Sequence, residues 1–214
     1  LEASIPSCVA DGGGTPTTLP LHLLERFFRF RKYRDYGGGS ASDLLCHTLG
    51  AMLVATGHEF PQKVSSAGGQ YVEFDRDIYD TYISTIEYPS QYTTILDGTM
   101  VSEYTGPEVI RGHEGFVEIG DGYVTVAPEG PFQSGFEDRV AKAGLKGEWG
   151  EVEIPRWHGV RKVKGLRIPA GEYQGFTDRF LHDDFIKCIR TREKPMEGAG
   201  EGYQITVAVE LGVT

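Results

Sequence analysis

The sequence predicts an α+β fold, with an open, mainly antiparallel sheet covered on one face by helices. Apolar residues recur at helical spacing near both ends of the chain, whereas the middle alternates with a period of two. The alternating runs are joined by short turns, which favour antiparallel neighbours over parallel crossovers. Helices that cover one face leave the other open. We therefore expect that other face to be an oligomer interface.

The clearest predicted helix spans residues 40–56. Ser40 fits the N-cap position, Asp43 follows three residues later as in a capping box, and Gly57 supplies the stop. Further helices are expected over 21–36 and 176–192. Residues 203–211 fit a helix or a strand, and we favour a helix. We divide the chain into a connector with a short helix, residues 1–36, and an α+β domain for substrate binding and oligomerisation, residues 37–214.

Six strands are predicted in the middle of the chain, because these segments are rich in Tyr, Val, Ile and Thr. They span residues 63–73, 80–88, 91–101, 108–112, 115–119 and 123–127. Residues 128–170 are rich in Gly and Pro and have weak periodicity. We expect them to form a long excursion over the sheet, and long ordered loops are often functional.

The charge balance excludes some classes of partner. There are 21 basic and 31 acidic residues, a net charge of -10, which disfavours nucleic-acid binding. We interpret the basic clusters at 26–34 and 156–167 as solvated faces or as partners of acidic side chains within the chain. No apolar run is long enough to span a membrane. The N-terminus has no Met and no signal-peptide pattern, so the chain is expected to start inside a longer protein, with the cytoplasm favoured.

The cysteines and histidines do not predict a disulfide framework or a metal site. Cys8, Cys46 and Cys188 are odd in number and irregularly spaced, so free thiols are expected. The histidines have no local ligand spacing. None of the 29 glycines belongs to a G-x-G-x-x-G dinucleotide motif.

The candidate catalytic residues are Asp43 and His47, which follow the run Gly37–Gly39. Residues four apart share one face of a helix, so Asp43 can orient His47. A histidine at that place can act as a general acid or base. The alternative is that Asp43 only caps the helix and His47 is a satisfied polar residue on its surface.

Candidate substrate-binding residues lie elsewhere in the chain. Tyr36 directly precedes the glycines, and His182 lies near the start of the late helix. Arg156, Trp157 and His158 combine an aromatic ring with polar neighbours, which suits stacking on a sugar, although a tryptophan in a loop is often only a packing anchor.

Several motifs appear in an order that is similar to one known family. Residues 37–47 read G-G-G-x-x-x-D-x-x-x-H, and 64–69 read V-x-x-x-G-G. Ile86–Pro89, Ile110–Gly115 and the segment His182–Pro195 follow. Over roughly residues 30–210, this order resembles the second domain of the Gfo/Idh/MocA oxidoreductases.

The resemblance implies a two-domain protein of which only the second domain is present. A missing N-terminal Rossmann domain would bind NAD or NADP, while this domain binds substrate and forms homo-oligomers. The resemblance implies that His47 handles the proton of the substrate hydroxyl while hydride passes to nicotinamide. It implies that Asp43 binds a substrate hydroxyl or orients His47. Glu193-Lys194-Pro195 matches the letters of the family's catalytic lysine motif. It follows the late helix, so we interpret it as a helix end.

The resulting hypothesis is the C-terminal domain of an NAD(P)-dependent oxidoreductase acting on a sugar, polyol or related hydroxy compound. By itself the chain is expected to bind no cofactor and to be inactive. Two alternatives stay open. One is a stand-alone binding or oligomerisation module without catalysis, and the other is a cofactor-dependent lyase or glycosidase of the same family.

Overall fold

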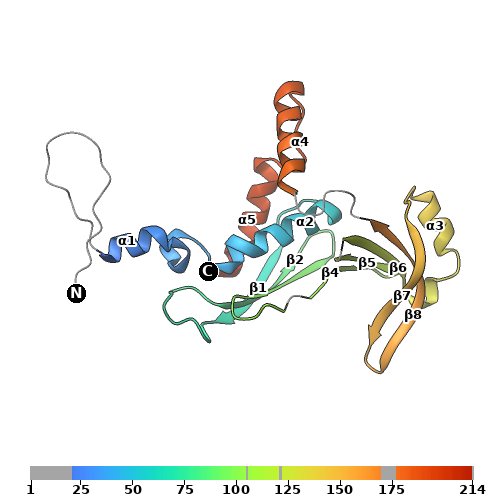
Figure 1. Ribbon diagram of the computed structural model, residues 1–214, viewed down its shortest axis with the longest axis horizontal. Coiled ribbons are helices and arrows are strands. Elements are labelled where there is room, and N and C mark those ends of the chain that lie inside the picture. Colours follow the sequence, from blue (N-terminus) through green and yellow to red (C-terminus); the bar gives the residue numbers. More distant parts are fainter. Residues whose placement is uncertain (1–20, 105, 121, 170–176, 214) are drawn as a thin grey trace. The chain divides into compact units, whose positions relative to one another are not determined.

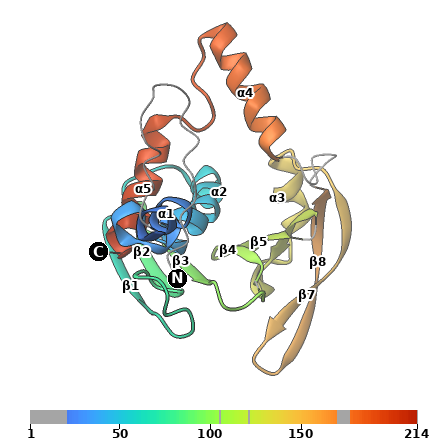
Figure 2. The same cartoon turned by 60° about the vertical axis from the view of Figure 1, so that its left-hand side comes forward.

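The computed structural model describes residues 21–104, 106–120, 122–169 and 177–213. The chain divides into two compact units. Unit 1 comprises the described residues of Leu1–Glu103 together with Glu197–Thr214, and unit 2 comprises those of Tyr104–Met196. The predicted boundary at residue 36 stays a prediction. Figures 1 and 2 show helices and antiparallel sheets in these units, which confirms the α+β class.

Unit 1 contains a three-stranded antiparallel sheet in the order β1-β2-β3. The strands are β1 (Lys63–Gly69), β2 (Thr81–Glu87) and β3 (Thr93–Thr99), close to the predicted positions. Along β2 the side chains of Tyr82, Ser84 and Ile86 are buried, whereas those between them are more exposed. This alternation is the period of two that the sequence showed.

Helices α2 (Cys46–Thr56) and α5 (Ala199–Val213) lie over this sheet, as Figures 1 and 2 show. Helix α5 confirms the helix predicted over 203–211. Helices and strands share one apolar core, which places both helices on the same face. Its largest side chains are Leu45, Leu49, Leu53, Tyr82, Ile86, Tyr88, Leu96, Ile205 and Val209.

The predicted N-terminal helix is shorter than expected. Helix α1 covers Leu21–Phe28, and two short 3-10 turns follow at Phe30–Lys32 and Arg34–Tyr36. The regular helix stops because the backbone at Arg29 leaves helical geometry, and Tyr33 is extended. The segment is therefore a short helix followed by two 3-10 turns rather than one continuous helix. We call residues 21–36 the strap.

The predicted helix over 40–56 is present, but it begins differently. Residues Ala41–Leu45 form a π-helical turn that leads into α2. The expected N-cap role of Ser40 is wrong, because Ser40 is itself helical (φ -59°, ψ -30°) and its side chain makes no capping bond. The hydroxyl that meets a backbone N–H here is that of Ser42, which accepts from Gly38 at 2.8 Å.

Unit 2 contains a five-stranded antiparallel sheet in the order β4-β5-β6-β8-β7. The predicted strands are present as β4 (Glu108–Arg111), β5 (Gly115–Gly120) and β6 (Tyr123–Pro128). Helix α4 spans Thr177–Thr191, which confirms the predicted late helix apart from residue 176, which lies outside the described residues. The strands thus fall into two sheets, because β3 and β4 do not pair.

The prediction for residues 128–170 is wrong. This segment holds helix α3 (Phe136–Lys142) and the long hairpin of β7 (Glu148–Arg156) and β8 (Gly159–Pro169). Figure 2 shows β7 and β8 as two long strands side by side. Only a few of its side chains reach a core, among them Val152, Val163 and Leu166. The rest are largely charged, so the apolar period of two is too sparse to read from the sequence.

The basic clusters have acidic partners within the chain, as expected. In the strap, Arg26 pairs with Asp35 at 3.0 Å. On the hairpin, Lys162 lies 2.6 Å from Glu151 and 3.3 Å from Glu153. These pairs are exposed and contribute little to stability each, but they account for the clustered charge.

Two further expectations concern thiols and membranes. Cys46 and Cys188 are free, and burial raises the pKa of both thiols, so both are poor nucleophiles. Cys8 lies outside the described residues. Among the helices that the structure describes, none is long and apolar enough to cross a membrane.

A buried carboxylate organises the loop between β1 and β2. Asp80 is fully buried, and its Oδ2 accepts backbone N–H bonds from Tyr71, Val72 and Glu73 at 2.8–2.9 Å. The hydroxyl of Thr81 donates to its other oxygen at 3.0 Å. Burial alone would raise the pKa of Asp80, but the hydrogen bonds together outweigh it and hold the pKa below its usual value.

Replacing Asp80 with alanine is expected to lower the melting temperature by roughly 5–10 °C, because three backbone N–H groups lose their acceptor. Asp80→Asn keeps one acceptor oxygen and is expected to cost less. In the native protein, ionised Asp80 stabilises the fold fully above the ordinary pKa of a carboxyl group. This stabilisation is lost as the pH falls through the lower pKa that Asp80 has in the folded state. The protection factors of the amides at residues 71–73, which correct for the intrinsic pH dependence of exchange, should therefore fall in acid; unchanged protection in Asp80→Ala would contradict this role.

Candidate functional site

The candidate site is built on the glycine run before the π turn. Gly39 has φ +67°, and a Cβ on it would lie 2.6 Å from Cδ1 of the buried Ile78. Only glycine fits both that backbone geometry and that contact. At Gly38 a Cβ would lie 3.1 Å from Oε1 of Glu210 on α5. The run is therefore fixed between the loop before β2 and helix α5.

The π turn carries Asp43 and leads to His47. Asp43 is half-buried, whereas His47 is exposed in the first turn of α2. In the described residues no hydrogen bond or ion pair joins the two side chains. The partner of Asp43 is Arg31, whose Nε donates to Oδ2 at 2.6 Å. Single π turns occur often at functional sites, because they displace side chains from regular helical positions.

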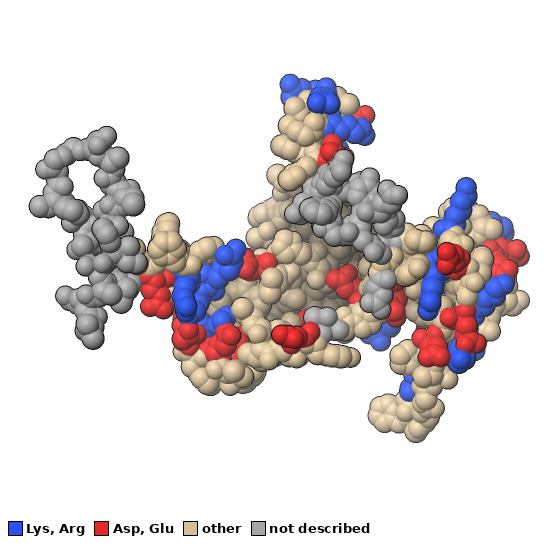
Figure 3. Space-filling view, in the orientation of Figure 1, with Lys and Arg blue, Asp and Glu red and all other residues tan. Residues whose placement is uncertain are grey.

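The strap that supplies Arg31 is fastened to the loop before β2. Lys32 forms an ion pair with Asp75 and accepts, through its carbonyl, the N–H of Asp77 at 3.0 Å. The N–H of Arg34 donates to the Asp77 carboxylate at 2.5 Å. Figure 3 shows basic and acidic side chains side by side over the part of unit 1 that holds helix α1. Arg31 is thus held beside Asp43 by its own bond and by the contacts of Lys32 and Arg34 on its C-terminal side.

Tyr36 lies at the end of the strap. Its side chain is exposed, its N–H donates to the carbonyl of Tyr33 at 3.0 Å, and the two rings meet edge to face. It therefore stands directly before the glycine run with its ring available to solvent. Tyr36, Asp43 and His47 all lie in unit 1, within residues 36–47, and their shared role stays a prediction.

The other candidate residues belong to unit 2. Arg156, Trp157 and His158 form the tip of the β7–β8 hairpin, where Trp157 is 94% exposed. Trp157 is thus not the packing anchor that the alternative interpretation proposed. Arg156 lies 3.9 Å from Glu129, and His182 is exposed on α4. Their role in substrate binding stays a prediction.

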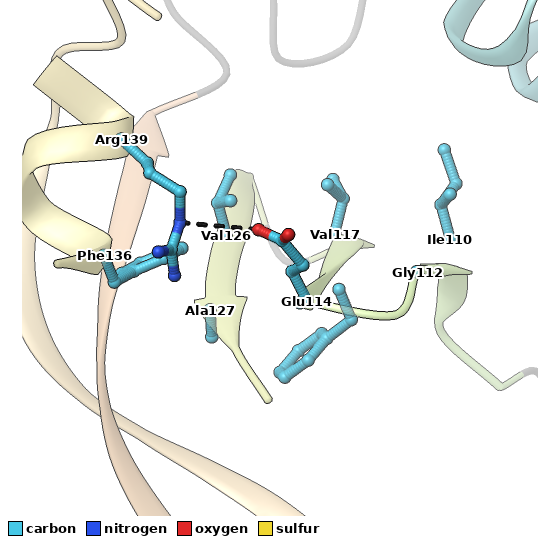
Figure 4. Close-up of a pocket in the computed structure, with 10 residues that line it drawn as sticks. Ile110, Gly112, Glu114, Val117, Val126, Ala127, Phe136 and Arg139 are labelled. Atoms are coloured by element: carbon cyan, nitrogen blue, oxygen red, sulfur yellow. Dashed lines mark ion pairs between the residues drawn. The ribbon is translucent and has the colours of Figure 1, made fainter. Parts of the chain in front are cut away.

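Unit 2 has a shallow apolar pocket of about 280 Å³ beside α3. Figure 4 shows Ile110, Val117 and Val126 on one face of β4–β6, with Phe136 of α3 alongside. At its edge Arg139 pairs with Glu114 at 3.6 Å. None of the predicted site residues lines this pocket, so it does not support their assignment.

The described residues do not fit a dinucleotide or a metal. All the strand pairs described are antiparallel, whereas a Rossmann-type site needs a parallel βαβ unit with its glycine turn. Within the described part of the chain, no group of three His, Cys, Asp or Glu side chains could hold a metal ion. A Rossmann-type dinucleotide site would therefore need residues outside those described.

Sequence reasoning missed Arg31 and Ile78. Arg31 belongs to a basic cluster that we assigned to internal pairing, but no spacing rule links it to Asp43 twelve residues later. Ile78 lies in a loop, and only the folded structure shows that it fills the space beside Gly39. The glycine run itself was the one signal that something packs closely there.

No established family profile matches the chain. One characterised protein, Endoglycoceramidase I from Rhodococcus hoagii (strain 103S), is 29% identical over 155 residues. The matched region is 64% of this chain and 30% of that protein. The chain therefore spans about a third of this relative.

Several solved oxidoreductase structures share the fold. UDP-N-acetylglucosamine 3-dehydrogenase GnnA from Acidithiobacillus ferrooxidans is 15% identical with a TM-score of 0.55, covering 89% of this chain and 58% of that one. An oxidoreductase from Agrobacterium radiobacter, in complex with NAD+, L-tartaric acid and magnesium, is 10% identical with a TM-score of 0.54 and coverages of 87% and 49%. An NAD-binding protein from Listeria innocua is 17% identical with a TM-score of 0.51 and coverages of 86% and 51%.

At these identities the comparisons establish the fold, and functions still have to be argued from the site. The chain covers most of its own length but only about half of each solved structure. In fold, the chain is therefore similar to Gfo/Idh/MocA-type oxidoreductases over about half their length, as expected for their C-terminal domain alone.

Proposed function

We propose that the chain is the substrate-binding C-terminal domain of an NAD(P)-dependent oxidoreductase acting on a sugar, polyol or related hydroxy compound. The observation that carries the proposal is the glycine run and π turn that present Asp43 and His47, within a fold shared with oxidoreductases. The dinucleotide would be held by a Rossmann domain outside this chain. The homo-oligomer that we expect would use the open sheet face.

The exposed imidazole of His47 takes the proton of a substrate hydroxyl, as a general base does. Asp43 accepts a hydrogen bond from that hydroxyl or its neighbour, with the carboxylate held in place by Arg31. A charge-assisted pair fixes the carboxylate before substrate arrives, which lowers the entropic cost of binding. Tyr36 offers its ring beside the glycine run for the apolar face of a sugar.

The proposal is tested with the complete protein encoded around this chain and with the chain alone. Both are incubated with NAD+ or NADP+ and a panel of sugars, polyols and hydroxy acids, and formation of the reduced nicotinamide is followed by absorbance. We expect turnover by the complete protein only. Absence of a dinucleotide-binding domain from the native polypeptide, shown by its intact mass, would favour the binding or oligomerisation module instead.

A second candidate is glycoside cleavage, because the 29% identical relative is named Endoglycoceramidase I. The two candidates differ in their products. A glycosidase releases nitrophenol from nitrophenyl glycosides, whereas a dehydrogenase accumulates reduced nicotinamide. Release of nitrophenol that depends on His47, without net reduction of the dinucleotide, would replace the dehydrogenase proposal with a cofactor-dependent lyase or glycosidase.

A further inference from the structure

We propose that Arg31 is a specificity-determining residue that binds an anionic group, a carboxylate or a phosphate, on the substrate held by Asp43. The inference rests on the proposed function and adds the charge of the substrate to it. It starts from one contact, because Nε of Arg31 donates to Asp43 Oδ2 at 2.6 Å. That bond uses one of the five N–H donors of the guanidinium.

The remaining donors of Arg31 face no acidic partner in the described part of the chain, where its one ion pair is with Asp43. The side chain is 63% exposed, so solvent and ligands can reach the guanidinium. The other basic side chains of the strap differ from it. Lys32 and Arg29 both approach Asp75, and Arg26 pairs with Asp35. Arg31 is paired instead with the residue that we place at the substrate.

The orientation of the guanidinium is fixed before any ligand binds. Its Cζ lies 4.6 Å from the centre of the Phe30 ring, a cation–π distance, while Asp43 holds its Nε edge. The backbone on the C-terminal side is fastened through Lys32 and Asp77. A guanidinium held in this way loses little freedom when it binds a second anion, and its planar fork matches carboxylate and phosphate oxygens.

The net charge of the protein determines how much an anionic ligand would depend on Arg31. The protein has a net charge of -10, so an anionic substrate is repelled by the molecule as a whole and needs local positive charge for binding. A neutral sugar has no such need. With donors left over beside Asp43, Arg31 would supply that charge to a hydroxy compound that carries a carboxylate or a phosphate within reach of the hydroxyl at Asp43.

The test compares three probes that share one sugar ring: glucose, glucuronate and glucose 6-phosphate. Binding to the full chain is measured by titration calorimetry at constant ionic strength. We expect at least one of the two anions to bind about tenfold more tightly than glucose. Arg31→Gln should remove that preference, and Arg31→Lys should keep part of it because the charge remains without the fork. Which anion is preferred distinguishes the carboxylate from the phosphate.

Arg29→Gln is the matched control, because it removes the same charge from the same strap and should leave the preference intact. Equal binding of the three probes, no binding of any probe, or a preference that survives Arg31→Gln would overturn the role of Arg31. Failure of the proposed function appears differently. In that case an anion preference would persist while binding and turnover of hydroxy compounds were unaffected in Asp43→Asn and His47→Ala.

Discussion

If the complete protein is the oxidoreductase that we propose, replacing His47 with alanine is expected to lower its turnover by about 10²- to 10⁴-fold. The substitution removes the group that we assign to the substrate hydroxyl proton. Because the side chain is exposed on the first turn of α2, its removal leaves the core intact. The loss should appear mainly in kcat, with a small change in KM, because binding of the hydroxyl is assigned to Asp43.

His113→Ala is a control for that variant. His113 is also exposed, and it packs only against Phe132 of unit 2. We expect its steady-state kinetics to match those of the unmodified protein. A His47→Ala enzyme with near-normal kcat would remove His47 from the mechanism and favour its interpretation as a polar residue on the helix surface.

Replacing Gly39 with alanine is expected to lower the free energy of unfolding of unit 1 by about 2–4 kcal/mol. Two effects add at this position. The backbone has φ +67°, which a residue with a Cβ rarely adopts, and the new methyl group would lie 2.6 Å from Ile78 Cδ1. Ile78 is itself buried, so it has little room to move. Urea unfolding followed by circular dichroism measures the loss.

Gly57→Ala separates the two effects. Gly57 has φ +102° and ψ 132°, a region open almost only to glycine, but a Cβ there would meet nothing within 4 Å, so only a backbone cost of about 1–3 kcal/mol applies. Gly37→Ala should be nearly neutral, because its nearest neighbour would lie 3.9 Å away and its φ is extended. Equal losses in Gly39→Ala and Gly57→Ala would show that contact with Ile78 contributes nothing. Ile78→Val in the Gly39→Ala background should recover part of the loss.

Much of the fold could be predicted from local sequence. Strands β1–β3, β5 and β6 and helices α2 and α5 have apolar side chains at regular spacing, and one face of each packs on a core. Helix α4 has the same spacing, but its Phe185, Ile186 and Ile189 side chains are exposed. The β7–β8 hairpin could not be predicted in this way. Three of its nine residue pairs join opposite charges, among them Glu153 with Lys162, and spacing along the sequence does not identify such partners.

The candidate site was partly predictable for the same reason. Regular helical geometry predicts a common face for Asp43 and His47, which lie four residues apart. The π turn over Ala41–Leu45 departs from that geometry, so the common face stays a prediction. The Arg31 contact depends on how the strap folds back along the loop before β2, and no local rule fixes that path. The π turn was also invisible in the sequence, because the same residues fit a regular helix equally well.

The distribution of tryptophan determines which parts of the molecule are visible to fluorescence. The chain has two tryptophans, and both lie in unit 2. Trp149 packs edge to face against Phe136 of α3, so its emission should report the docking of that helix, whereas Trp157 stands in solvent before and after unfolding. Tryptophan emission is consequently silent on unit 1, where the proposed chemistry lies. Opening of the Asp43 site would pass unseen in a standard unfolding curve unless tyrosine signals or a tryptophan introduced near the strap were recorded as well.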